Sequence, residues 1–329
     1  MEIRKYNPNE PLVADGVYSG VPFDMYCRLP RMNSNTLRWA LTSAKHLYAA
    51  MEGLLGFEDT PDTFIGRAIH CKVLEPERFE EEFPVAGLCC QQLKSGKRKG
   101  QRCSLPGVAV ERDYSHKCDA WLCGRHATDS NSDEVKGGAL SPQQNQRVIG
   151  AANAVFKSRW AREYLFESLG TELTVLCTLS GIPCKCRLDF LCDGLIGDVK
   201  KVRRGAVLAE KFSYAIDDWG YDVQAAMYVD SLRQFQVGKQ FEVSCWKSPD
   251  EFAWLLVEDD EPHDVAMYWC DDETLETGRR KYQYCLDILQ SSRRSGCWAG
   301  TGECDGKPMV GVPWRVKDDW LIPQHRING

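Results

Sequence analysis

The sequence lacks any long hydrophobic run. In its 329 residues, no apolar stretch approaches the roughly 18 residues that a membrane-spanning helix needs. The first twelve residues, MEIRKYNPNEPL, also lack the hydrophobic core of a signal peptide. We therefore expect a cytoplasmic protein that has no contact with a membrane.

An excess of positive charge is absent as well. The chain has 41 Lys and Arg residues against 47 Asp and Glu residues, so its formal net charge is −6. This balance argues against a protein that coats nucleic acid non-specifically, although a local basic groove can still bind nucleic acid. No internal repeat or low-complexity tract is visible, and the length suits one large domain or one domain with an insertion.

Cysteine, in contrast, is abundant, with 16 residues. Without a secretion signal these are better explained as thiols and metal ligands than as a disulfide framework. Between residues 89 and 138, basic residues, glycines, cysteines and histidines replace the apolar periodicity. We interpret this segment as an inserted module between a helical part, 1–88, and a core with an irregular tail, 139–329.

Hydrophobic periodicity and turn residues predict an α/β chain. Cap-plus-proline pairs at Thr60-Pro61 and Ser141-Pro142 predict two helix starts. The predicted helices cover 36–55, 60–74, 141–166, 213–235 and 272–292. The predicted strands cover 172–179, 184–192, 195–202, 240–247 and 252–258.

Residues 186–200, CRLDFLCDGLIGDVK, place charges inside two apolar strands, where an unpaired charge is costly to bury. A short Asp193-Gly194 turn would bring Asp189 close to Asp198 and Lys200. Two carboxylates and a lysine at one end of a strand pair suit an oxygen-ligated cation such as Mg²⁺ or Mn²⁺. A solvent-facing strand with ordinary ion pairs would show the same pattern.

Further motifs carry a resemblance to a known family. Asp189 followed by Asp198-Val199-Lys200 resembles the PD-(D/E)XK nuclease signature. In GYDVQAAMY, Gln224 and Tyr228 resemble the Q-x-x-x-Y motif of the RecB-like branch of that superfamily. The segments GRAIHCKVLEPERF, GTEL and NSNTLRWALTSAKHLY are similar to parts of the exodeoxyribonuclease VIII (RecE) family. The resemblance spans roughly residues 20–87 and 140–315.

This resemblance implies a restriction-endonuclease-like core, a central mixed sheet flanked by helices, interrupted here by the cysteine-rich module. It implies that Asp189, Asp198 and the Val199 carbonyl hold the metal, supported by His70. Lys200 would position the attacking water. The remaining implied site residues are Glu172, Gln224 and Tyr228.

For several of these residues a role outside catalysis stays open. His70 could be a core histidine, Glu172 a surface charge, and Tyr221 a packing residue on the same helix face as Gln224. After the motif lysine the family usually has threonine, whereas this chain has Lys201. With Arg203 and Arg204 it forms KKVRR, a basic run that could contact DNA phosphates or remain a solvated face.

The activity implied is that of a Mg²⁺-dependent exonuclease degrading linear double-stranded DNA from its ends, with 5′→3′ polarity. Such enzymes of phages and prophages act in recombination with a single-strand annealing partner, and the chain would form a homo-oligomer in the bacterial host cell. One alternative is a structure-specific endonuclease or nickase on the same core. Another is a non-catalytic phage factor that binds DNA or protein.

The cysteine-rich module predicts a structural Zn²⁺, which prefers four thiolate or imidazole ligands in a tetrahedron. Cys123 and His126 form a C-x-x-H pair, and Cys90 and Cys103 flank a loop rich in glycine and lysine. Three further residues compete for the same metal, namely Cys89, His116 and Cys118. A metal-free insert is the alternative.

Overall fold

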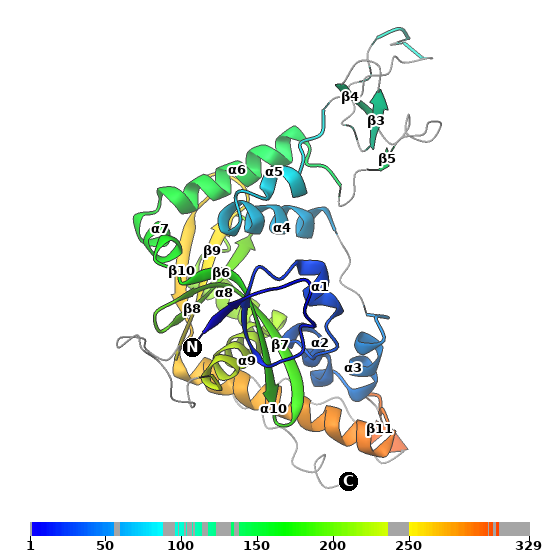
Figure 1. Ribbon diagram of the computed structural model, residues 1–329, viewed down its shortest axis with the longest axis vertical. Helices are drawn as coiled ribbons and strands as arrows, with labels where there is room; N and C mark the ends of the chain where they lie inside the picture. Colours follow the sequence, from blue (N-terminus) through cyan, green and yellow to red (C-terminus); the bar gives the residue numbers. More distant parts are fainter. Residues whose placement is uncertain are drawn as a thin grey trace.

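A seven-stranded mixed sheet forms the centre of the protein (Figure 1). The computed structural model describes residues 2–55, 60–87, 138–235 and 250–301, a few positions between 96 and 107, and the backbone of short strands within 109–134 and 303–308. The strand order is β1-β2-β6-β7-β8-β9-β10. The strands are β1 Ile3–Lys5, β2 Gly16–Ser19, β6 Gly170–Leu179, β7 Ile182–Cys192, β8 Leu195–Val202, β9 Glu251–Glu258 and β10 Val265–Trp269.

Helices cover both faces of this sheet, as the alternating side chains of β9 require. Phe252, Trp254 and Leu256 pack toward one helical layer, while Ala253 and Leu255 pack toward the other. The second layer contains α4 Pro61–Leu74, α5 Phe79–Glu82, α6 Pro142–Lys157 and α7 Arg159–Phe166. The first contains α2 Ser34–Leu37, η1 Arg38–Leu41, α3 Ala44–Met51, α8 Ala209–Trp219, α9 Tyr221–Arg233 and α10 Asp272–Ser295.

The two predicted cap-plus-proline starts are confirmed. Thr60 precedes α4 and its hydroxyl accepts the Thr63 amide, with proline at the first helical position. Ser141 precedes α6 and accepts the Gln144 amide in the same way. Each cap satisfies N–H groups that the first turn of a helix otherwise leaves unpaired. Helix α4, which carries His70, therefore begins where the sequence predicts.

Three helices predicted as continuous are broken. The helix predicted over 141–166 forms α6 and α7, because Ser158 adopts extended backbone, ends α6 and caps α7 by accepting the Ala161 amide. The segment predicted as one helix over 36–55 forms α2, η1 and α3, because Ser43 adopts extended backbone and caps α3 by accepting the His46 amide. The helix predicted over 213–235 is α8 followed by α9. Gly220 joins them with φ of 67°, a left-handed conformation that glycine adopts without strain. This turn sets the direction of α9, which carries Gln224.

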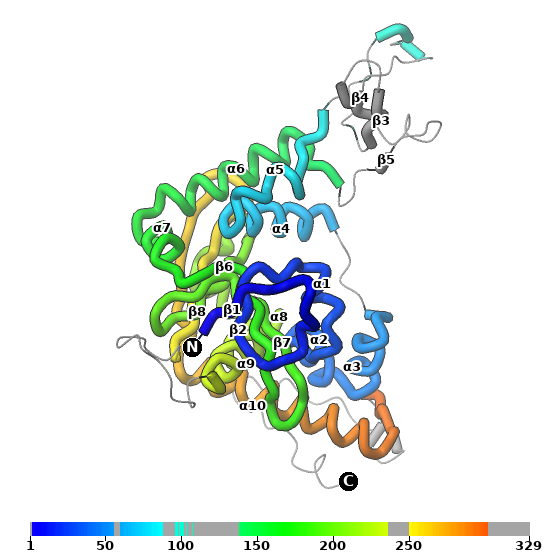
Figure 2. The backbone as a smooth tube through the Cα atoms, viewed as in Figure 1, coloured from blue at the N-terminus to red at the C-terminus, as the bar shows by residue number. Residues whose placement is uncertain are grey.

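The N-terminal segment adds elements that the sequence did not predict. Strand β2 pairs antiparallel with β6, and β1 pairs parallel with β2. Helix α1, Phe23–Arg28, lies near β7 (Figure 2). The buried Lys185 ammonium of β7 donates to carbonyl oxygens at the end of α1, those of Tyr26, Cys27 and Leu29, at 2.8–3.0 Å. This capping fixes the segment to the sheet.

Most of the cysteine-rich module lies outside the described residues, and so do three of the predicted zinc ligands, Cys90, Cys123 and His126. Cys103 is described and is buried. Short strands of the module, β3 Ala109–Asp113, β4 Cys118–Leu122 and β5 Asp133–Glu134, form a separate sheet in the order β4-β3-β5. The strand predicted over 240–247 also falls on residues that are not described. No described helix has the length and hydropathy to span a bilayer.

Candidate active site

The β7–β8 hairpin separates at the point where its carboxylates lie. Its ladder runs from Cys192↔Leu195 to Phe190↔Gly197. Beyond that pair, the side chain of Asp189 replaces a strand contact, because its Oδ2 accepts the backbone N–H of Val199 at 2.6 Å. Gly197 is required here, since a Cβ at this position would lie 1.8 Å from the Phe190 ring. The pairing of β7 with β8 therefore ends at Asp189.

His70 of α4 lies over this opening. Its Nε2 is 2.6 Å from the Val199 carbonyl oxygen and 3.3 Å from Asp189 Oδ2. Its Nδ1 is 3.9 Å from Glu172 Oε1 of β6. One possible ligand atom each from His70, Glu172 and Asp189 lies within 4.8 Å of the others. Imidazole nitrogen, carboxylate oxygen and a backbone carbonyl oxygen therefore converge on one small volume.

The electrostatics of this cluster suit a cation. Burial raises the pKa of Asp189 to about 7, and the charges of Asp198 and Glu172 add to that rise. Burial alone would lower the pKa of His70, but Asp189 and Glu172 outweigh it and raise that pKa to about 9. The carboxylates thus favour a positive charge between them. A divalent ion would satisfy the same carboxylates through oxygen ligands, so the donor set fits a divalent metal.

Glu172 is held in an unusual backbone conformation. Its φ of 51° lies in the left-handed region, which costs a residue other than glycine about 1–3 kcal/mol. It lies between Thr171 and Leu173, which pair with Phe190 and Leu188, so it faces Asp189 across the strands. The Nε of Arg187 donates to its Oε2. This strained backbone conformation of Glu172 accompanies the placement of its carboxylate beside His70.

Asp198 and Lys200 form a second group with Gln224 of α9. Lys200 Nζ is 2.6 Å from Asp198 Oδ2 and donates to Gln224 Oε1 at 3.0 Å. Gln224 Nε2 donates to Asp198 Oδ1 at 2.8 Å. Burial would lower the pKa of Lys200, but the Asp198 charge outweighs it and raises that pKa, so the ammonium stays protonated. The amide fixes both the carboxylate and the lysine.

Two tyrosines of α9 border this group. The Tyr221 ring lies 4.6 Å from Lys200 Nζ in a cation–π contact. Tyr228 is buried, packs edge-on against Phe252 and interacts with Gln224. Burial raises the pKa of Tyr228 well above its ordinary value, so the neutral phenol persists.

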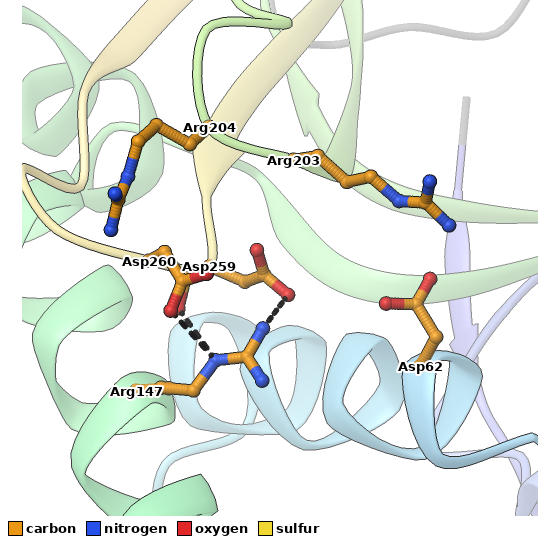
Figure 3. Close-up of a pocket in the computed structure, with 6 residues that line it drawn as sticks. All are labelled: Asp62, Arg147, Arg203, Arg204, Asp259 and Asp260. Atoms are coloured by element: carbon orange, nitrogen blue, oxygen red, sulfur yellow. Dashed lines mark hydrogen bonds and ion pairs between the residues drawn. The ribbon is translucent and has the colours of Figure 1, made fainter.

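The basic run after Lys200 has a nearly buried residue, Lys201, and two exposed ones, Arg203 and Arg204. Lys201 is nearly buried and lies 2.6 Å from Asp62 and 3.5 Å from Asp259. Arg203 and Arg204 are exposed and line a shallow cavity of about 320 Å³. Figure 3 shows both extending from the segment after β8, while Arg147 of α6 is held by the Asp259 and Asp260 carboxylates. The cavity is thus lined by Asp62, Arg147, Arg203, Arg204, Asp259 and Asp260.

The structure brings the residues singled out in the sequence into two adjacent groups rather than one. Asp189 lies with His70 and Glu172, whereas Asp198 lies with Lys200. The groups remain linked, because Asp198 raises the pKa of Asp189 and Val199 belongs to the strand that carries Asp198. Arg187, two residues before Asp189 in β7, is a residue of the site that sequence reasoning missed. The contact of Arg187 with Glu172 depends on the pairing of β6 with β7, which no local sequence motif predicts.

A family model described as "PDDEXK-like domain of unknown function (DUF3799)" matches residues 34–307. The chain belongs to this family. The resemblance to the PD-(D/E)XK superfamily is thereby confirmed, while a closer relation to exodeoxyribonuclease VIII stays a prediction.

The fold also resembles that of a solved structure, a protein from Eubacterium rectale described as a "putative exonuclease". The match covers 89% of this chain and 93% of that one, with a TM-score of 0.52 and 13% sequence identity. At this identity the likeness establishes the fold alone. The predicted mixed sheet flanked by helices is accordingly confirmed. A comparison with curated proteins finds no match.

Proposed function

We propose that the protein is a nuclease that uses Mg²⁺ or Mn²⁺ to degrade linear double-stranded DNA from its ends. The observation that carries this proposal is the convergence of His70, Asp189, Glu172 and the Val199 carbonyl beside the Asp198–Lys200–Gln224 group. A cation held by the buried carboxylate cluster, together with the neighbouring protonated lysine, suits an anionic phosphodiester better than a neutral substrate.

Different residues of the site would bind the cation, position the attacking water and orient the neighbouring side chains. Asp189, Asp198 and the Val199 carbonyl would hold the cation, and Glu172 and His70 would support it from β6 and α4. When bound, such a cation neutralises charge on the phosphate and lowers the pKa of a bound water. Lys200 would orient the attacking water through its Nζ, which Gln224 fixes in place. Tyr228 would keep the Gln224 amide oriented.

A preference for DNA ends is supported by what the basic residues can contact. Arg203 and Arg204 are exposed and suit phosphates, which carry no sequence information. Lys201 has two carboxylate partners, which supports a role in joining α4 to β8. Selection of a free end would then rest on DNA shape, and the resemblance to exodeoxyribonuclease VIII supports 5′→3′ polarity, a homo-oligomer and an annealing partner.

One assay tests the proposal. Linear duplexes labelled at the 5′ or 3′ end and closed circular plasmid are incubated with the protein and Mg²⁺, Mn²⁺ or EDTA. We expect metal-dependent shortening of the linear duplex, with closed circles spared. The variant Asp189→Asn should be inactive, and Asp218→Asn, an exposed residue on α8, should match the wild type.

Two results would redirect the assignment. Nicking of closed plasmid as fast as shortening of the linear duplex would favour the endonuclease. Absence of cleavage on both substrates with either metal would favour the non-catalytic binding factor.

A further inference from the structure

Arg38 differs from the other arginines that are buried or half-buried in the described part of the chain. Each of those others has a carboxylate oxygen within 4.0 Å: Arg31, Arg78, Arg147, Arg187, Arg233 and Arg279. For Arg38, the described residues supply no carboxylate at all within that distance. An arginine taken out of water normally acquires an anionic partner, because its charge cannot be neutralised by losing a proton.

The Arg38 side chain is nevertheless held in one orientation. Arg38 begins η1, and its Nη1 donates to the carbonyl oxygen of Trp219, the last residue of α8, at 2.7 Å. Its Nε is buried and has no hydrogen-bond partner among the described residues. Capping of α8 therefore accounts for one of the five N–H donors of the guanidinium. Because Nε is buried, a ligand would be bound by the remaining N–H donors of Nη1 and Nη2.

The position of Arg38 connects it with the candidate active site. Trp219 and Gly220 lead directly into Tyr221, the first residue of α9. Arg38 and Tyr221 interact electrostatically, and the Tyr221 ring is in contact with the Lys200 ammonium. Arg38 is thus linked to Lys200 through Tyr221, and it comes from a helical segment far away in the sequence.

We propose that Arg38 binds a backbone phosphate of the substrate strand, next to the phosphodiester that is cleaved. This inference rests on the proposed function. A planar guanidinium matches two phosphate oxygens at once, which gives both affinity and orientation. The hydrogen bond to the Trp219 carbonyl orients the Arg38 guanidinium before substrate binds, so little side-chain freedom is lost on binding. The contact would fix the register of the strand relative to Lys200.

The test measures binding separately from cleavage. A fluorescein-labelled blunt duplex is titrated by anisotropy with Ca²⁺ in place of Mg²⁺, over a range of salt concentrations. Arg38→Gln should raise the Kd about tenfold and reduce the salt slope by about 1. Arg38→Lys should retain the salt slope with a smaller loss of affinity. The control Arg159→Gln removes an exposed charge on α7 and should change neither quantity.

A second measurement identifies the phosphate. A series of duplexes, each with one neutral methylphosphonate near the end, is bound to the wild type and to Arg38→Gln. At one position, the methylphosphonate should weaken binding of the duplex to the wild type but leave its binding to Arg38→Gln unchanged. If thermal unfolding shows that Arg38→Gln does not fold, Arg38→Lys takes its place, and its binding should be weakened less than that of the wild type by the methylphosphonate at that position; equal weakening would overturn the bidentate contact.

The outcomes separate the two proposals. Equal Kd, equal salt slope and equal sensitivity to every methylphosphonate in wild type and variant would overturn the role of Arg38 while leaving the nuclease intact. A wild-type protein that neither binds nor cleaves DNA would overturn the proposed function itself.

Discussion

We expect the substitution Lys281→Met in α10 to show how strongly the contact between α10 and α9 stabilises the protein. Helix α9 carries Gln224 of the candidate site. The Nζ of Lys281 lies 2.7 Å from Asp222 Oδ2 of α9 and 2.8 Å from Asp217 Oδ1. The side chains of Lys281 and Asp222 are both only 4% exposed, whereas Asp217 is 64% exposed. Replacing Lys281 by methionine leaves the Asp222 carboxylate buried without its cation. Loss of one partner of a buried pair costs about 3–5 kcal/mol.

The loss should depend on pH in a defined direction. Burial raises the pKa of Asp222, and Lys281 opposes that rise, so without Lys281 the pKa is higher still. A carboxyl group whose pKa is raised by folding stabilises the folded state fully below its unfolded pKa of about 3.9, and this contribution is lost as pH rises. The destabilisation by Lys281→Met should therefore be larger at pH 7 than at pH 5. The double variant with Asp222→Asn should recover part of it.

Urea unfolding followed by tryptophan fluorescence at both pH values measures these differences. The matched control is Arg279→Met, two residues away on the same helix, whose guanidinium binds Asp230 at 2.8 and 2.9 Å. Asp230 keeps the Tyr282 hydroxyl and Arg233 as partners, so this variant should lose less stability. An unchanged midpoint for Lys281→Met at pH 7, or an equal loss at both pH values, would refute the reasoning.

Three further predictions follow from the same structure. Cleavage should fall by orders of magnitude in each of the variants Asp189→Asn, Asp198→Asn and Lys200→Ala while the protein remains folded, although Lys200→Ala should lower stability because it leaves the buried Asp198 without its cation. Near-normal activity in any of them would place the site elsewhere. Gly278→Ala should lose about 1–3 kcal/mol in urea unfolding, because a Cβ there would lie 2.0 Å from a backbone oxygen of α9, whereas Gly296→Ala has open space around it and should lose only the cost of its backbone conformation. Metal analysis of protein purified without chelator should find about one zinc per chain; its absence would contradict the predicted ligands Cys90, Cys103, Cys123 and His126.

Local chemistry was the part of the fold that the sequence predicted best. The caps at Thr60 and Ser141 act within four residues, so their signal is complete in the sequence. The breaks at Ser43 and Gly220 are also local, but the apolar periodicity on either side hid them. Periodicity describes which face is buried and does not reveal whether one helix or two present it.

Elements stabilised by distant partners could not be predicted in this way. The short strands β1 and β2 carry no strong alternation. Strand β2 is ordered by pairing with β6, more than 150 residues later, and β1 by pairing with β2. The same limit applies to the site. Asp198 and Lys200 are two residues apart in one strand, so their ion pair is local in the sequence. The hydrogen bond of Arg38 to Trp219, in contrast, spans 181 residues and depends on how η1 meets the end of α8.

The charged face of β7 explains why two apolar strands tolerate so many ionic groups. Lys185 caps α1, Arg187 binds Glu172 and the Val21 carbonyl, and Asp189 takes the Val199 amide. Each charge has a specific partner, so none of them is the uncompensated buried charge that would destabilise the sheet. The first two fix the surroundings of the third. Besides presenting the Asp189 carboxylate, β7 thus positions α1 through Lys185 and the strained Glu172 through Arg187.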